Sequence, residues 1–293
     1  MVVEHVLAIG NEVGETPIWI PEEQALYWID IEGKRVFRLA PATGAVQSWD
    51  PGVPVTALAR RAGGGWVLAT KVGIYLWSPA SGPATFLVNP VADRPGIRFN
   101  DAAVDRQGRL LAGSMNERDL YAPDGALFRI DPDGAVTRLD EGYAVANGIG
   151  LSPDGHTLYV TDMFHGRILA YDYDPGPGTA SGRRTFATVP AADGLPDGLI
   201  VDSEGCVWGA HWAGARVTRY DPAGSIERVI RLPVPMVTCM GFGGPDLTDL
   251  YVTTAWFTLD AAARQANPQS GDLFRVRTGI RGLPEPEFGA LPR

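Results

Sequence analysis

The chain has 293 residues, of which 45% are hydrophobic and 20% charged, as is typical of a soluble globular protein. Its formal net charge of −9 argues against a protein that binds the phosphate backbone of nucleic acids. No apolar run approaches the roughly 18 residues of a membrane-spanning helix, and the first residues lack the positive segment of a secretory signal. We therefore expect a cytoplasmic protein without nucleic-acid or membrane partners. Its two cysteines, Cys206 and Cys239, allow at most one disulfide and are expected to be reduced thiols.

Turn-forming residues are spread along the whole chain, which contains 36 Gly and 24 Pro. This distribution predicts many short strands joined by tight turns. In chain order, a short apolar segment at His5–Ile9 precedes six segments of similar pattern. Asp105, Asp154 and Asp202 recur in the turns of these segments and are expected to stabilise hairpins. The best helical candidate, Asp260–Gln265, is at most one turn long.

Each of the six segments begins its first strand-like part with a short apolar run. The runs are Leu26–Trp28, Trp66–Leu68, Leu110–Ala112, Leu158–Val160, Val207–Gly209 and Leu250–Val252. Their starting residues are 40, 44, 48, 49 and 43 positions apart. A period near 45 residues with several strands per unit is typical of a propeller blade.

These repeats predict an all-β fold, a six-bladed β-propeller of four-stranded antiparallel blades that forms one domain over residues 1–293. The segment at His5–Ile9 is expected to be the strand that completes the last blade and closes the ring. A β-solenoid or two stacked sandwiches are the alternative folds.

A carboxylate or amide residue recurs ten or eleven positions before four of the apolar runs. The residues at this phase are Glu15, Thr56, Asn100, Asn147, Asp197 and Met240, in blade order. Singly, Asn147-Gly148 or Asp197-Gly198 would be read as a turn. Because equivalent positions of different blades meet around a propeller axis, the four carboxylate or amide residues are expected at one end of the channel. Carboxylates that converge in this way favour a bound cation, with oxygen ligands that suit Ca²⁺, Mg²⁺ or Mn²⁺.

Five longer motifs extend this pattern along nearly the whole chain. They are GETPIW (14–19), RFNDAAVDRQGRLLAGSM (98–115), VANGIGLSPDGHTLYVTD (145–162), LPDGLIVDSEGCVWGAHW (195–212) and FGGPDLTDLYVTTA (242–255). In this order they resemble the gluconolactonase and regucalcin (senescence marker protein) family, and are most similar to bacterial aldonolactonases. The resemblance implies a six-bladed propeller, one divalent cation and hydrolysis of a sugar lactone.

Carried over to this sequence, the family's metal ligands fall on Glu15, Asn147 and Asp197. Its substrate-contacting arginine and asparagine fall on Arg98 and Asn100. A further acidic substrate contact falls near Glu117, although strict counting places Arg118 at that position. We take Glu117 as the acid. This departure from the family's motif indicates either a different substrate or a rearranged loop.

The mechanism expected from these residues is metal-assisted ester hydrolysis. The cation, which can be Ca²⁺, Mn²⁺, Zn²⁺, Mg²⁺ or Fe²⁺, polarises the ester and activates water. Asp197 is expected to be the catalytic general base, while Arg98 and Asn100 orient the sugar. Asp101 is expected to hold the Asn100 turn, and His211 with Trp212, on or after the inner strand of blade five, to line the mouth of the channel.

Two other functions fit parts of the sequence. One is a calcium-binding or scaffolding propeller without catalysis, and the other is a related propeller esterase that acts on a non-sugar ester. Ser114 lies in no GxSxG motif, so a serine-triad esterase is disfavoured. A closed propeller has no obligatory interface, and we expect a monomer whose partner is a small sugar lactone.

Overall fold

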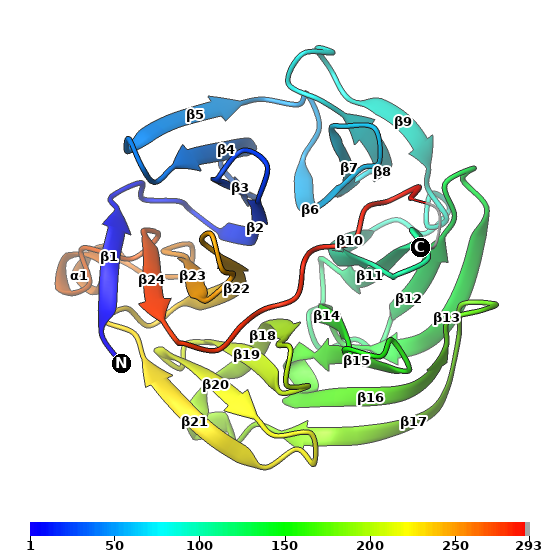
Figure 1. Cartoon of the computed structure of the whole chain (residues 1–293). Coiled ribbons are helices and arrows are strands. Elements are labelled where there is room, and N and C mark those ends of the chain that lie inside the picture. The colour runs from blue at the N-terminus through cyan, green and yellow to red at the C-terminus, as the bar shows by residue number, and fades with distance from the viewer. Residues whose placement is uncertain (291–293) are drawn as a thin grey trace. The chain divides into compact units, whose positions relative to one another are not determined.

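A computed structural model describes residues 1–290, and nearly all of their regular structure is β-strand (Figure 1). The strands form six sheets, each of four antiparallel strands. This confirms the predicted six-bladed β-propeller of four-stranded blades. No helix within these residues is long and apolar enough to cross a bilayer.

The chain divides into two compact units, each with three of the six blades. The first contains Met1–Trp49 and Val189–Pro284, and the second contains Asp50–Thr188 and the residues from Glu285 onward. The single domain expected over residues 1–293 stays a prediction, and its last three residues lie outside the described part of the chain.

The first unit holds blades one, five and six. Blade one contains β2 (Gly14–Ile20), β3 (Ala25–Asp30), β4 (Arg35–Ala40) and β5 (Ala45–Trp49). Blade five contains β18 (Leu195–Val201), β19 (Val207–Trp212), β20 (Arg216–Tyr220) and β21 (Ile226–Arg231). Blade six contains β22 (Val237–Gly243), β23 (Asp249–Thr254), β24 (Leu273–Arg277) and, at its outer edge, β1 (Val3–Leu7).

The pairing of β1 with β24 runs from Val3↔Val276 to Leu7↔Leu273. The N-terminal strand therefore completes the last blade, as predicted. Two short helices also belong to this unit, η2 (Ala191–Asp193) before β18 and α1 (Ala261–Ala266) between β23 and β24. The Asp260 carboxylate caps α1 by accepting the Ala263 N–H at 2.8 Å. With six residues, α1 is longer than the single turn expected at this place.

The second unit holds blades two, three and four. Blade two contains β6 (Val55–Arg60), β7 (Trp66–Thr70), β8 (Gly73–Trp77) and β9 (Thr85–Val88). Blade three contains β10 (Ile97–Val104), β11 (Leu110–Asn116), β12 (Gly125–Ile130) and β13 (Val136–Tyr143). Blade four contains β14 (Ala146–Leu151), β15 (Thr157–Asp162), β16 (Arg167–Asp174) and β17 (Thr179–Thr188), with η1 (Met163–His165) between β15 and β16.

Burial falls from the first to the last strand of a blade. In blade one every residue of β2 and β3 is buried, whereas four of the five residues of β5 are exposed. Aromatic side chains supply much of the core volume of the first unit, where Trp28 and Trp208 are fully buried. Removal of this apolar surface from water is the main term that holds each blade against its neighbour in the unit.

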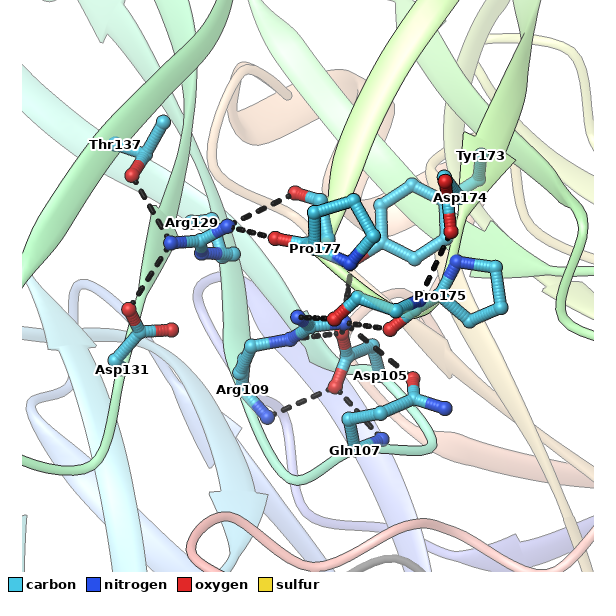
Figure 2. Close-up of polar contacts among 12 residues, drawn as sticks. Asp105, Gln107, Arg109, Arg129, Asp131, Thr137, Tyr173, Asp174, Pro175 and Pro177 are labelled. Atoms are coloured by element: carbon cyan, nitrogen blue, oxygen red, sulfur yellow. Dashed lines mark hydrogen bonds and ion pairs between the residues drawn. The ribbon is translucent and has the colours of Figure 1, made fainter.

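The aspartates of the hairpin turns accept backbone N–H groups within those turns, as expected, and one of them also joins two blades. In blade three the buried Asp105 accepts the N–H groups of Gln107 and Arg109 and forms an ion pair with Arg109 at 2.6 Å. Tyr173 of blade four donates to the same carboxylate at 2.7 Å, and Arg109 donates to the Pro175 carbonyl at 2.7 Å (Figure 2). This network joins blades three and four at the turn between β10 and β11.

Candidate functional site

The innermost strand of every blade breaks register with its neighbour at an equivalent place. A polar residue begins or fills each break. It lies on the inner strand, four positions before the residue that pairs with the first residue of the apolar run. These residues are Glu15, Thr56, Asn100, Asn147, Asp197 and Thr238. β-Bulges redirect side chains and recur beside functional sites. The polar phase seen in the sequence is therefore a repeated backbone feature.

The residue at this position in blade six is Thr238, so the assignment to Met240 was wrong. Met240 pairs regularly with Val252, while Thr238 fills the break between Val237 and Cys239. The cause is a longer hairpin: Phe242 pairs with Leu250, which lies eight residues later, whereas the corresponding spacing in blade five, from Val201 to Val207, is six. Counting ten positions back from Leu250 therefore reaches Met240, two residues after the bulge residue Thr238.

In the first unit, the bulges of blades one and five bury two carboxylates. Glu15 is 7% exposed and Asp197 is 4% exposed. Glu15 Oε2 accepts the N–H of Thr16, which has a positive φ of 48°, at 2.9 Å. Buried carboxylates require hydrogen bonds or a cation, and oxygen donors of this kind fit a hard divalent ion. Their joint coordination of an ion stays a prediction.

Gly198 explains why a glycine follows Asp197. A Cβ atom at this residue would lie 2.6 Å from Cys239 Sγ and 2.9 Å from the Thr238 carbonyl oxygen. Only glycine lets β18 approach β22 this closely. The Asp-Gly pair read as a possible turn is thus a bulge packed against the neighbouring blade. Cys239 and Cys206 are both buried, and neither forms a disulfide within residues 1–290.

In the second unit, Asn100 and Asn147 lie on adjacent inner strands. Asn147 Oδ1 accepts the Gly148 N–H at 3.0 Å, and its Nδ2 donates to Met163 Sδ at 3.5 Å. Asn100 Nδ2 donates to the carbonyl of Ala146, the residue before Asn147, at 3.4 Å. The predicted substrate residue Asn100 and the predicted ligand Asn147 are therefore neighbours.

Arg98 connects this pair to Glu117. Its Nη1 donates to Asn100 Oδ1 at 3.2 Å, and its Nε donates to Glu117 Oε1 at 3.1 Å. Arg118 instead places its side chain beside Gly96 and donates its backbone N–H to Asn116 Oδ1 at 2.9 Å. The loop thus brings Glu117, and not Arg118, to Arg98. A substrate contact by Glu117 stays a prediction.

Lys71 also reaches this carboxylate, at 2.9 Å between Nζ and Glu117 Oε1. Partial burial raises the pKa of Glu117, but the hydrogen bond from Lys71 and the charges of Arg98 and Lys71 outweigh it, so that the pKa lies below its usual value. The sequence does not indicate that Lys71 meets Glu117, because Lys71 follows β7 of blade two and lies in none of the motifs.

Asp101 fills the bulge of blade three together with Asn100 and is buried. Its Oδ1 accepts the N–H of Ala102 at 2.7 Å, so it stabilises this turn as expected. Burial raises the pKa of Asp101 to about 6.

His211 and Trp212 lie on β19, the second strand of blade five, directly after the inner strand β18, which agrees with the expected position on or after that strand. That they line the mouth of the channel stays a prediction. His211 pairs with Pro196 and is 2% exposed. Its Nδ1 lies 2.9 Å from the Asp193 carbonyl oxygen, an acceptor, so Nδ1 carries the proton. Burial lowers the pKa of His211 to about 4. Its Nε2 has no hydrogen-bond partner within residues 1–290.

One further acidic group occurs at the hairpin turn of blade five, where Asp202, Glu204 and Cys206 place ligand atoms within 4.8 Å of one another. Asp202 already accepts from Trp208 Nε1 at 2.8 Å and pairs with Arg219 at 2.8 Å. Arg219 also pairs with Glu204 at 2.6 Å. This group is therefore an ion-pair network that corresponds to the Asp105 network of blade three.

Comparisons with known proteins agree with this architecture. Residues 13–278 match the family model of the SMP-30/Gluconolactonase/LRE-like region. Regucalcin of Xenopus laevis is 35% identical over 98% of both chains. A pentonolactonase of Haloferax volcanii is 36% identical over 97% of both chains. The structure of regucalcin from Agrobacterium tumefaciens, a calcium-binding protein, matches with a TM-score of 0.93 and 29% identity, over 99% of this chain and 98% of that one. The resemblance seen in the motifs is confirmed, and the chain belongs to the SMP-30/gluconolactonase/LRE-like family.

Proposed function

We propose that this protein hydrolyses a sugar lactone to the corresponding aldonic acid in a reaction that depends on one divalent metal ion. As a member of the gluconolactonase-like family, the chain is a hydrolase that acts on cyclic carboxylic esters, and the Haloferax volcanii relative is named a pentonolactonase. The observation that carries the finer proposal is the group of Arg98, Asn100 and Glu117 next to Asn147, which offers donors and an acceptor to a hydroxylated substrate.

The proposed metal ligands are Glu15, Asn147 and Asp197, with two carboxylate groups and one amide oxygen. Their support is the family resemblance, their equivalent bulge positions and their burial. A divalent cation bound there would polarise the ester carbonyl and lower the pKa of a water molecule. Ca²⁺, Mn²⁺, Zn²⁺, Mg²⁺ and Fe²⁺ all fit such an oxygen-rich set, and the calcium-binding neighbour supports a divalent ion in general.

Asp197 is the proposed general base. It accepts a proton from water as the water oxygen attacks the carbonyl carbon of the lactone. The ring C–O bond then breaks, and the same proton passes from Asp197 to the departing ring oxygen. The products are a carboxylic acid, which releases the second proton of the water to solvent and becomes a carboxylate, and a free hydroxyl group on the same open chain, so the base is regenerated in each turnover.

Arg98, Asn100 and Glu117 orient the sugar in this proposal. Arg98 donates hydrogen bonds to hydroxyl or ester oxygens, while the Glu117 carboxylate accepts from a hydroxyl group. Because Arg98 is already held by Asn100 and Glu117, little side-chain freedom is lost when the substrate binds.

A pH-stat assay with glucono-, xylono-, arabinono- and galactonolactone tests the function. We expect hydrolysis of at least one lactone, loss of the activity after treatment with a chelator, and recovery when a divalent metal is added. Metal binding without hydrolysis would favour a calcium-binding or scaffolding propeller. Chelator-sensitive hydrolysis of aryl esters but not of sugar lactones would favour a non-sugar esterase. We propose that the active form is a monomer, which sedimentation at assay concentration would show.

A further inference from the structure

Two aromatic side chains stand on neighbouring loops of the second unit, and these loops also carry the predicted substrate residue Glu117 and the Asn147 contact Met163. Tyr121 lies in the connection from β11 to β12, and Phe164 lies in η1. Their rings meet edge to face, with centroids 5.0 Å apart and planes at 75°. Tyr121 is nevertheless 69% exposed. A large ring held in place but left open to solvent offers a surface to a ligand.

The loop of Tyr121 is held firmly. Asn116 Oδ1 accepts the N–H groups of Arg118 and Asp119, and Asn116 Nδ2 donates to Asp124 Oδ2 at 2.8 Å, across the loop. Asp119 Oδ1 in turn accepts the Tyr121 N–H at 3.1 Å. Glu117 is part of the same loop, so the positions of Tyr121 and Glu117 are fixed relative to each other.

Contacts connect the two aromatic residues to the polar residues by two routes. One runs through the loop from Tyr121 to Glu117 and on to Arg98 and Asn100. The other runs from Phe164 to its chain neighbour Met163, whose sulfur accepts from Asn147. Asn100 closes the circuit by donating to the Ala146 carbonyl. The circuit is thus divided between polar side chains and two aromatic side chains.

This division matches the surface of a sugar lactone. Hydroxyl and ester oxygens lie around the edge of the ring, while C–H groups make its faces apolar. Binding sites for small molecules combine apolar and aromatic walls with a few polar groups that fix orientation. We propose that Tyr121 and Phe164 form an aromatic wall that packs against a C–H face of the lactone and determines its affinity and selection. This inference rests on the proposed function.

Substitution of the wall tests it. Tyr121→Ala and Phe164→Ala are expected to raise KM for the preferred lactone roughly three- to tenfold, with little change in kcat, as loss of an aromatic contact predicts. Tyr121→Phe keeps the ring and should keep KM within about twofold of the wild type, because the contact needs the ring and not the hydroxyl.

Blade two offers a matched control. Tyr75 and Phe86 form a similar edge-to-face pair, at 5.4 Å and 76°, and Phe86 is 56% exposed on the outermost strand β9. Phe86→Ala should leave both KM and kcat unchanged. Thermal melting of all variants shows whether they fold.

Two results separate this inference from the function on which it rests. If the wild type hydrolyses lactones but folded Tyr121→Ala keeps its KM, or if Tyr121→Phe is as impaired as Tyr121→Ala, the aromatic wall is wrong and the function stands. If the wild type hydrolyses none of the lactones, the proposed function is wrong, and the proposal of an aromatic wall for a lactone is wrong as well.

Discussion

The bulges of blade five and blade two have similar backbones but different side chains. Both interrupt the first strand pair at the equivalent place, after Pro196 in blade five and after Val55 in blade two. Blade five places the carboxylate of Asp197 there, whereas blade two places Thr56, whose hydroxyl is buried with no hydrogen-bond partner within residues 1–290. The bulge is therefore part of the fold, and we expect the residue in it to decide whether a blade takes part in chemistry.

The largest expected contrast is between Asp197→Asn and Thr56→Val. Loss of the base should lower kcat on the order of 10³-fold. Thr56→Val replaces an unsatisfied hydroxyl by a methyl group of similar size and should leave kcat and melting temperature nearly unchanged. Initial rates at saturating metal and lactone measure the difference. Near-normal kcat in a metal-loaded Asp197→Asn variant would exclude this residue as the base.

The residues opposite the two bulges differ in their response to pH. His211 faces Pro196 in blade five, where blade two has Thr70 opposite Val55. Since the folded pKa of His211 is lowered from 6.5 to about 4, its neutral form adds stability above pH 6.5, which is lost as the pH falls through 4.

Replacement by glutamine removes this dependence. The free energy of unfolding of His211→Gln should therefore fall less than that of the wild type between pH 6.5 and 4, by up to about 3 kcal/mol. Urea unfolding at several pH values measures it. Parallel pH profiles for the two proteins would show that burial does not suppress protonation of His211.

A similar comparison tests metal binding, between the bulge residues Glu15 of blade one and Thr238 of blade six. With metal at about 100 times its Kd, the wild type should gain about 2.7 kcal/mol of stability, and Glu15→Gln should lose most of this gain. Thr238 Oγ1 donates to the Gly14 carbonyl and lies 2.9 Å from Thr253 Oγ1, so Thr238→Val should cost about 1 kcal/mol but keep the metal-dependent gain. Calorimetric melting with chelator and with added metal separates the two effects. Equal gains in both variants would contradict a ligand role for Glu15.

The smallest expected effect concerns the loop of blade three. Glu117→Gln keeps the shape but loses the charge that meets Arg98 and Lys71, and should raise KM roughly tenfold. Arg118→Ala should leave KM unchanged, because its side chain lies beside Gly96. Steady-state kinetics on one lactone decides between them. A larger rise in KM for Arg118→Ala than for Glu117→Gln would show that the loop brings Arg118, and not Glu117, to the substrate.

Part of the candidate site could be predicted from the sequence because its residues occupy equivalent positions of a repeat. Glu15, Asn100, Asn147 and Asp197 were visible at one phase of the repeat, and their bulges confirm that phase. Thr238 was missed because a longer hairpin shifted the count. The sequence left open whether His211 lies on the inner strand of blade five or after it, because one motif runs from the inner strand into the next, and the structure places it on the second strand, β19.

The sequence by itself determined the number of blades, the N-terminal strand of the last blade and a polar residue on most inner strands. These features depend on local alternation and spacing, which each repeat carries within its own 45 or so residues. The tertiary structure alone decided that Glu117 and not Arg118 meets Arg98, that Lys71 joins them, and that Tyr121 meets Phe164. The contacts of Lys71 with Glu117 and of Tyr121 with Phe164 join different blades, and that of Arg98 with Glu117 joins a strand to a loop of the same blade, so their geometry depends on how the strands that carry them pack.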